Sequence, residues 1–240
     1  MEPRMNNLGQ PVGHSMEGWQ AASKPPLTPI DGRLCRLEPT RMDHAADLFS
    51  AYSEDNENYN WTYLPYGPFD SENALRSWME VACFGADPLF HTVIDKASGK
   101  AVGVATYLRI EPAAGVIEVG HINFSPLMQR TAMATEAMFL MMRRVFKELG
   151  YRRYEWKCDN LNAPSKRAAE RLGFRFEGIF RQATLYKNRN RDTAWYAIID
   201  QEWPALEQAF NAWLDVDNFD ESGQQKARLG ELKAKFGAAE

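Results

Sequence analysis

The strand, turn and helix encoded by residues 115–150 constrain the fold more than any other part of the sequence. A run of β-branched and aromatic residues from 116 to 124 predicts a buried strand, and Pro126 ends it. The turn that follows leads directly into a helix, which we expect to extend from residue 130 to residue 149. The helix begins with small residues, so its first N–H groups and the positive end of its dipole are open to a ligand. The segment therefore predicts a site for a phosphorylated molecule.

The elements around this segment predict a mixed α/β fold. Three consecutive antiparallel strands and then a strand–helix–strand crossover favour a mixed sheet over a doubly wound parallel one. Two helices separate the first two strands, and Thr40 is expected to cap the first of these helices. The predicted strands are 33–38, 89–95, 101–110, 116–124, 153–158, 174–181 and 192–200, and the other predicted helices are 40–53, 71–84, a short one after residue 162, 204–214 and one within 215–240.

Composition narrows the classes of function. A net charge of −4 and a sequence pI near 5.7 argue against a general nucleic-acid-binding protein, whose surface would be basic. The three cysteines, Cys35, Cys83 and Cys158, lie far apart without C-x-x-C spacing, which favours reduced thiols over a metal site. No apolar run approaches the roughly 18 residues needed to span a bilayer. We therefore expect a soluble cytoplasmic protein without a metal, a nucleic-acid partner or a membrane partner.

The turn before the central helix carries the motif Gln129-x-x-Ala132-x-Ala134. This motif resembles the pyrophosphate-binding turn of the GNAT superfamily of acyl-CoA N-acyltransferases, Q/R-x-x-G-x-G/A. The flanking sequences 118–126 and 135–137 resemble the branch of the ribosomal-protein acetyltransferases RimJ and RimL. Ala132 replaces the first glycine of the pattern, and alanine requires a negative φ, so we expect the chain to be helical already at this residue.

A second and more specific signature is Asn162-x-x-Ser165, followed by a short helix and Leu-Gly-Phe at 172–174. It resembles the segment after the fifth strand of the same family, where the Asn bonds a pantetheine amide and the Ser lies near the cofactor's sulfur. Helix capping by Asn162 is the alternative, and both roles can coexist. The resemblance covers residues 31–204. It predicts an N-terminal arm at 1–29, either laid over the body or disordered, a GNAT acetyltransferase domain at 30–204 and a C-terminal helical extension at 205–240.

The resemblance implies acetyl-CoA as the cofactor and a direct transfer in a ternary complex. Polarisation of the thioester oxygen is expected from a main-chain N–H at a bulge near residues 123 and 124. Glu118 and His121 are the candidate bases, but a regular strand points them to opposite faces, so only one reaches the pocket unless a bulge separates them. A chain of water molecules could also serve as the base. Ser165 is the candidate acid, with Tyr186 or Tyr196 as substitutes. The predicted cofactor-binding residues are Asn123, Phe124, Gln129, Arg130, Thr131, Ala132, Met133, Ala134, Thr135, Asn162 and Ser165.

A loop at residues 56–69 carries five aromatic rings and is the candidate acceptor wall. Trp61, Tyr63 and Tyr66 are predicted to contact the acceptor, although packing on the core would also explain them. The predicted acceptor is a primary amine, either a protein N-terminus or a small molecule. Two alternatives are a CoA-binding regulatory protein without catalysis and a transferase for a longer acyl group such as succinyl. A homodimer is one possible assembly.

Overall fold

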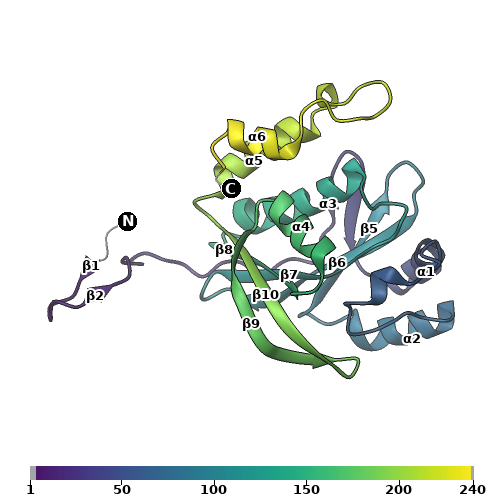
Figure 1. The fold of residues 1–240 in the computed structure, drawn as a ribbon, viewed down its shortest axis with the longest axis horizontal. Coiled ribbons are helices and arrows are strands. Elements are labelled where there is room, and N and C mark those ends of the chain that lie inside the picture. The colour runs from purple at the N-terminus through teal and green to yellow at the C-terminus, as the bar shows by residue number, and fades with distance from the viewer. Residues whose placement is uncertain (1–3, 239–240) are drawn as a thin grey trace.

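The computed structural model describes residues 4–238 and is built around one eight-stranded sheet (Figure 1). Neighbouring strands in this sheet run antiparallel, except for the pair β7 and β8, which is parallel. The predicted mixed, mostly antiparallel sheet is therefore confirmed. In spatial order its strands are β3 (Ile30–Asp31), β4 (Cys35–Pro39), β5 (Leu89–Asp95), β6 (Ala101–Glu111), β7 (Val116–Phe124), β8 (Arg153–Asp159), β10 (Arg189–Ile199) and β9 (Arg175–Tyr186).

Helices cover both faces of the sheet, and each face has its own cluster of buried apolar side chains. Side chains of β5 alternate between the two clusters, because Leu89 and Val93 belong to one and Phe90 to the other. The helices are α1 (Ala45–Ser53) and α2 (Glu72–Ala82) on one face, and α3 (Ala132–Arg143), α4 (Ala163–Arg171), α5 (Trp203–Leu214) and α6 (Leu229–Lys235) on the other. The π-helical segment η3 (Arg144–Glu148) continues α3, and η1 (Met42–His44), η2 (Tyr59–Trp61) and η4 (Val216–Asn218) are short 3-10 helices.

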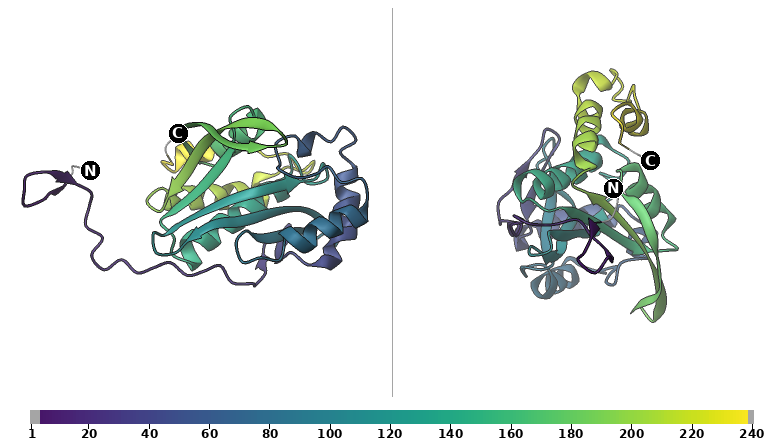
Figure 2. Two further views of the ribbon diagram at one scale, coloured as in Figure 1. Left: turned by 90° about the horizontal axis from the view of Figure 1, so that it is seen from below. Right: turned by 90° about the vertical axis from the view of Figure 1, so that its left-hand side faces the viewer.

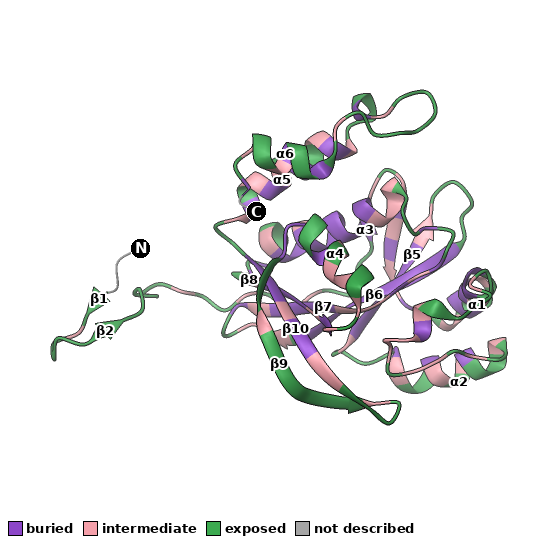
Figure 3. Ribbon diagram, viewed as in Figure 1, coloured by how far each residue is buried: buried purple, intermediate pink, exposed green. Residues whose placement is uncertain are grey.

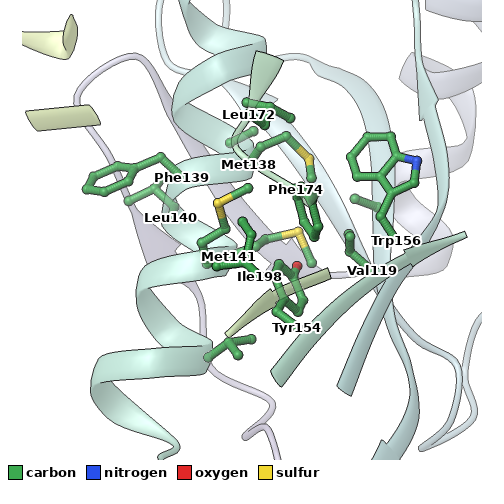
Figure 4. Packing of buried hydrophobic residues seen from close by; sticks show 14 of the residues in the cluster. Val119, Met138, Phe139, Leu140, Met141, Tyr154, Trp156, Leu172, Phe174 and Ile198 are labelled. Atoms are coloured by element: carbon green, nitrogen blue, oxygen red, sulfur yellow. The ribbon is translucent and has the colours of Figure 1, made fainter. Parts of the chain in front are cut away.

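Helix α3 is the central element of the larger cluster (Figure 4). Every residue from 138 to 142 is buried, because the sheet lies on one side of the helix and α5 on the other. Phe139 stacks on Phe210 of α5, with ring centroids 5.3 Å apart. A helix that is enclosed in this way can be apolar around its whole circumference, as the sequence of α3 is. The helix begins at Ala132, as the alanine at this position predicts.

The N-terminal arm divides into two parts with different contacts. From residue 16 onwards it follows the body, where Trp19 Nε1 donates to the carbonyl of Ala113 at 3.0 Å and Ser23 N–H donates to the carbonyl of Leu149 at 2.9 Å. The preceding strands β1 (Arg4–Met5) and β2 (Pro11–Val12) pair with each other and extend away from the body (Figure 2). The arm is thus laid over the body along its second part only.

Two local predictions are wrong. Thr40 does not cap the first helix, because its hydroxyl lies 3.0 Å from the hydroxyl of Thr92 on β5. The closing hairpin is longer than predicted: β9 and β10 continue to a two-residue turn at Lys187 and Asn188, both with positive φ. The outer half of this hairpin lies beyond the core, and β9 is exposed along most of its length (Figure 3), so it lacks the apolar alternation that reveals a strand.

Within residues 4–238, the helices are too short or too polar to cross a membrane.

Candidate active site

The parallel strands β7 and β8 separate where a cavity opens. Their pairing ends at Val119 and Trp156, although both strands continue beyond these residues. The cavity beside this opening has a volume of about 560 Å³. Its walls come from the loop between α1 and α2, from β6, β7 and β8, from the start of α4, and from the β9–β10 hairpin. Distant parts of the sequence therefore meet at the point where two neighbouring strands stop pairing.

A β-bulge on β7 brings both predicted bases to this cavity. Gly120 pairs with Thr106 and Asn123 pairs with Val104, so His121 and the residue after it lie opposite a single residue of β6. His121 has a φ of 47°, which breaks the regular alternation of side chains. The bulge lies between residues 118 and 123, and Glu118 and His121 both line the cavity as a result.

Asn123 and Phe124, the predicted location of the bulge, lie just beyond it and do not line this cavity. The Asn123 side chain is buried, and the main-chain carbonyl of Asn123 accepts a hydrogen bond from the Tyr52 hydroxyl at 3.3 Å. The Phe124 carbonyl accepts the side-chain amides of Asn60 and Gln129 at 3.2 and 2.7 Å. These carbonyls hold the neighbouring loops in place.

Glu118 is a buried carboxylate with two cationic partners. Its Oε1 lies 2.7 Å from Arg109 Nη1, and its Oε2 lies 2.7 Å from Lys157 Nζ. Burial raises the pKa of Glu118 above its usual value, while Lys157 and Arg109 act in the opposite direction. Glu118 can therefore accept a proton, but only by giving up part of two ion pairs.

His121 is less constrained by its partners. Its Nδ1 lies 3.3 Å from the hydroxyl of Tyr66, and the two rings stack with centroids 5.6 Å apart. Burial, together with the charges of Arg109 and Arg191, lowers the pKa of His121 to about 4. The imidazole is therefore neutral at pH 7. When Nδ1–H donates to Tyr66, Nε2 has a free lone pair.

Asn162 and Ser165 lie on the opposite side of the opening, and both line the cavity. Asn162 caps α4, since its Oδ1 accepts the N–H of Ser165 at 3.1 Å. The capping role is therefore confirmed, and the Nδ2 group of the same amide can still serve a ligand. The Ser165 hydroxyl accepts a hydrogen bond from Trp156 Nε1 at 3.0 Å, so its own proton can donate to the Cys158 sulfur or to a ligand.

The turn before α3 is accessible to solvent. Gln129, Arg130 and Thr131 are exposed, and the first three residues of the helix are half-buried. Thr131 Oγ1 accepts the N–H of Ala134 at 3.3 Å, whereas the N–H groups of Ala132 and Met133 have no carbonyl one turn earlier within the helix. The Gln129 side chain bonds Asn60 as well as Phe124, which fixes the turn. The hydroxyl of the buried Thr135 accepts a hydrogen bond from Arg171 at 3.0 Å.

The three aromatic acceptor candidates occupy different places. Tyr63 lines the cavity, and its hydroxyl donates to the carbonyl of Leu161 at 3.1 Å. Tyr66 lies behind His121, and Trp61 is buried in the cluster around α1 and α2. Trp61 acts through its backbone instead, because its carbonyl accepts a hydrogen bond from Lys187 at the tip of the β9–β10 hairpin at 2.7 Å.

The two substitute acids also differ. Tyr186 lines the cavity, and its hydroxyl donates to Asp159 Oδ2 at 2.7 Å. Burial and this carboxylate raise the pKa of Tyr186 to about 12. Tyr196 is fully buried, and its hydroxyl donates to Glu170 at 3.1 Å, so it belongs to the core.

The sequence did not single out four charged residues of the cavity, Arg109, Lys157, Asp159 and Arg191. Arg191 could have been found from the two-residue period of side chains along β10, which places Arg191, Thr193 and Trp195 on one face of the strand. That signal was missed because the predicted strand began at residue 192.

A mixed sheet, a parallel strand pair that opens beside a bulge, and a helix with an accessible N-terminus define the GNAT fold. Residues 34–175 match the family described as Acetyltransferase (GNAT) domain, and the chain belongs to this family of acyltransferase enzymes.

Solved structures extend this assignment. A GCN5-related N-acetyltransferase from Brucella melitensis is 50% identical with a TM-score of 0.89, and the match covers 91% of this chain and 100% of that one. A probable acetyltransferase of the GNAT family from Chromobacterium violaceum is 43% identical with a TM-score of 0.75, covering 81% and 98%. RimL and the Mycobacterium smegmatis RimJ share the fold at 18% and 21% identity, each with a TM-score of 0.59. The first two similarities are much stronger than the last two.

Among curated proteins, the uncharacterized N-acetyltransferase YnaD of Bacillus subtilis (strain 168) is 34% identical over 86 residues. This match covers 36% of this chain and 50% of the length of the relative.

Proposed function

We propose that this protein transfers an acetyl group from acetyl-CoA to a primary amine, directly within a ternary complex, and that residues 30–204 form the catalytic domain. The observation that carries the proposal is the cavity at the opening between β7 and β8. There Glu118 and His121 from one strand face Asn162 and Ser165 from the start of α4. Membership of the GNAT family supports acetyl-CoA as the donor.

The chain offers a fitting cradle for the cofactor's phosphates. The N–H groups of Ala132 and Met133, the positive end of the α3 dipole and the exposed Arg130 would hold the pyrophosphate. The side-chain amide of Asn162 would bond an amide of the pantetheine arm. Bound acetyl-CoA supplies an acetyl group activated as a thioester.

The bulge supplies the group that polarises the thioester oxygen. A residue inserted into one strand leaves its backbone groups outside the regular ladder, and His121 and Ile122 occupy this position at the cavity wall. In this proposal an N–H of the bulge takes the role that the sequence prediction gave to residues 123 and 124.

The amine is the remaining reactant. Three cations line the cavity, Arg109, Lys157 and Arg191, and like charges lower the pKa of a bound ammonium. The C–N bond forms as the C–S bond breaks. The nitrogen's proton passes to Nε2 of His121, directly or through water, and the departing sulfur takes a proton from Ser165 or Tyr186. That hydroxyl regains its proton from His121 through water, so that both side chains return to their starting states.

A second candidate activity, transfer of a carboxylated acyl group such as succinyl, is favoured by one observation, the presence of these cations in the cavity. Mass spectrometry of products decides between the two: the protein is incubated with acetyl-CoA or succinyl-CoA together with free amines and lysate peptides. Acetylated amines or peptide N-termini support the main proposal and show which of the two acceptors is used. Succinylated products with succinyl-CoA alone support the second. Binding of CoA without any product indicates a regulatory protein.

We also propose a cytoplasmic location. All three cysteines, Cys35, Cys83 and Cys158, are free and buried, which suits a reducing compartment.

A further inference from the structure

Arg191 differs from the other cations of the cavity in its partners. It lies on the face of β10 that also presents Thr193 and Trp195 to the cavity. Its Nε donates to the Thr193 hydroxyl at 3.1 Å, which fixes the side chain. Across residues 4–238, the structure contains no carboxylate in an ion pair with the Arg191 guanidinium, and the two nitrogens at its tip remain available.

The carboxylates of the cavity are already engaged elsewhere. Glu118 is paired with Arg109 and Lys157, each at 2.7 Å. Asp159 accepts hydrogen bonds from the Tyr186 hydroxyl at 2.7 Å and from the N–H of Leu161 at 2.8 Å. Of the three cations that line the cavity, Arg109 pairs with Glu118 and Lys157 pairs with Glu118 and Glu155, whereas Arg191 has no carboxylate partner among the described residues.

The position of this charge is close to the proposed chemistry. Burial lowers the pKa of His121, and the charges of Arg109 and Arg191 lower it further. The charge of Arg191 also opposes the burial that raises the pKa of Tyr186 and of Cys158 on the neighbouring strand β8. Arg191 lines the cavity at the opening between β7 and β8 together with His121, Tyr186 and Cys158. A planar guanidinium with two free nitrogens matches the two oxygens of a carboxylate.

We propose that Arg191 binds a carboxylate carried by one of the two reactants, so that the enzyme acts on carboxylated substrates. With acetyl-CoA as donor, the carboxylate belongs to the acceptor, which is then a small amine with an acid group, such as an amino acid. With a dicarboxylic acyl-CoA as donor, it belongs to the acyl group. This inference rests on the proposed acyl transfer and adds the substrate class.

One consequence follows for the proposed base. A bound carboxylate neutralises the charge of Arg191, which is one cause of the low pKa of His121. Burial is the main cause of this low pKa, so we expect a bound carboxylate to raise the pKa of His121 only by the smaller part that Arg191 contributes. An amide of the same shape does not have this effect.

The test uses matched pairs of acceptors with acetyl-CoA: glycine with glycinamide, and β-alanine with β-alaninamide. The second arm compares succinyl-CoA with acetyl-CoA at a fixed uncharged amine. We expect the wild-type protein to prefer the carboxylated member in one arm. Arg191→Gln should lower kcat/KM for that member by about 10- to 100-fold more than for the member without the carboxylate, because only the carboxylated member loses a charge-assisted hydrogen bond.

Two variants control for other effects. Arg181→Gln removes the same charge from an exposed position of the same hairpin outside the cavity, and it should leave the preference unchanged. Arg191→Lys should keep part of the preference, because it keeps the charge without the planar fork. CoA protection against heat should be equal in all three variants, which separates this site from the phosphate site.

Calorimetric titration of the CoA-saturated protein with each acceptor pair provides a readout without turnover. If the acid binds more tightly than the amide and Arg191→Gln abolishes this difference, the carboxylate site is supported. If no product forms in that case, only the proposed transfer fails. The carboxylate site is overturned if the wild-type protein does not prefer the carboxylated reactant in either arm, or if Arg191→Gln lowers turnover or binding equally for the carboxylated and the uncharged reactant. Either result leaves acetyl transfer in place.

Discussion

Lys157 Nζ lies 2.7 Å from Glu118 Oε2, and this ion pair joins the two parallel strands where they begin to separate. The same ammonium lies 2.8 Å from Glu155 Oε2 and 3.7 Å from the centroid of the Trp195 ring. The buried ammonium of Lys157 thus pairs with two buried carboxylates and packs on Trp195, which lines the cavity. We therefore expect the opening between the strands to depend on Lys157 as well as on backbone geometry.

Replacing Lys157 tests this dependence. Lys157→Met leaves two buried carboxylates without their shared partner, and we expect a loss of about 3 kcal/mol in the free energy of unfolding, measured in urea. Lys100→Met is the matched control, because its pair with Asp47 is largely exposed and should contribute less than about 1 kcal/mol. Equal losses in the two variants would show that the buried pair has no special role.

The pH dependence of stability follows from His91. This fully buried side chain packs edge-on against Tyr107, and burial together with the charge of Arg144 lowers its pKa to about 4. The unfolded chain binds the proton near pH 6.5, so the stabilisation is present above that pH and is lost as the pH falls towards 4. The shift corresponds to about 3 kcal/mol. His121, whose pKa is also about 4, adds to the loss in the same window.

His91→Gln should therefore flatten the pH dependence of the unfolding free energy between pH 6.5 and 4. Thermal or urea unfolding at several pH values measures this slope, and a comparison at pH 8, where both states carry a neutral imidazole, gives the packing effect of the substitution by itself. A slope identical to that of the wild-type protein would contradict the assignment.

The fold could be predicted from the sequence because its strongest signals are local. The β-branched run of β7, the apolar α3 and the stop at Gly150 each depend on neighbouring residues only, and together they fix the crossover. Thr40 shows the limit of such signals. Threonine favours the position before a helix, but the Thr40 hydroxyl bonds Thr92 on a distant strand and does not cap the helix. The residues next to Thr40 in the sequence do not predict that bond.

The candidate site could be predicted only in part, for a related reason. Glu118, His121, Asn162 and Ser165 were found through motifs, and the structure brings all four to one cavity. Arg191 was not found, because its role depends on the fold of a hairpin whose outer half has no buried face. The bulge at His121 could not be placed either, since register between strands is not encoded in either strand alone.

The proposed phosphate site at the start of α3 is tested by Ala134→Asp. The new carboxylate would lie against the cofactor's phosphates, so CoA should no longer raise the melting temperature. The apo protein should be at least as stable as the wild type, because an acidic residue in the first helical turn complements the dipole. Ala134→Ser adds a side chain of similar reach without charge and should keep the protection. Full protection by CoA in Ala134→Asp would count against this site.

The tip of the β9–β10 hairpin contacts the loop between α1 and α2, which is the proposed acceptor wall. Lys187 Nζ donates to the carbonyl of Trp61 at 2.7 Å, and Arg189 donates to the neighbouring carbonyl of Thr62 at 2.5 Å. Removing both contacts in a Lys187→Ala, Arg189→Ala variant should raise the KM for the acceptor several-fold without changing the KM for acetyl-CoA. Hydrogen exchange at residues 59–66 should increase in parallel. Arg181→Ala, on the same hairpin but away from the tip, is the control, and an equal change there would exclude a specific contact.

The choice between Glu118 and His121 as base can be made from their pH profiles. His121 is neutral above about pH 4, so kcat/KM should rise with pH as the amine loses its proton and show no inflection near pH 6.5, the usual pKa of histidine. His121→Gln should lower kcat about 100-fold with CoA protection unchanged. Glu118→Gln should instead lower the free energy of unfolding, because Arg109 and Lys157 lose their shared partner. If Glu118→Gln abolishes kcat in a fully folded protein while His121→Gln keeps most of it, the roles are reversed: Glu118 takes the proton, and His121 only supports the bulge.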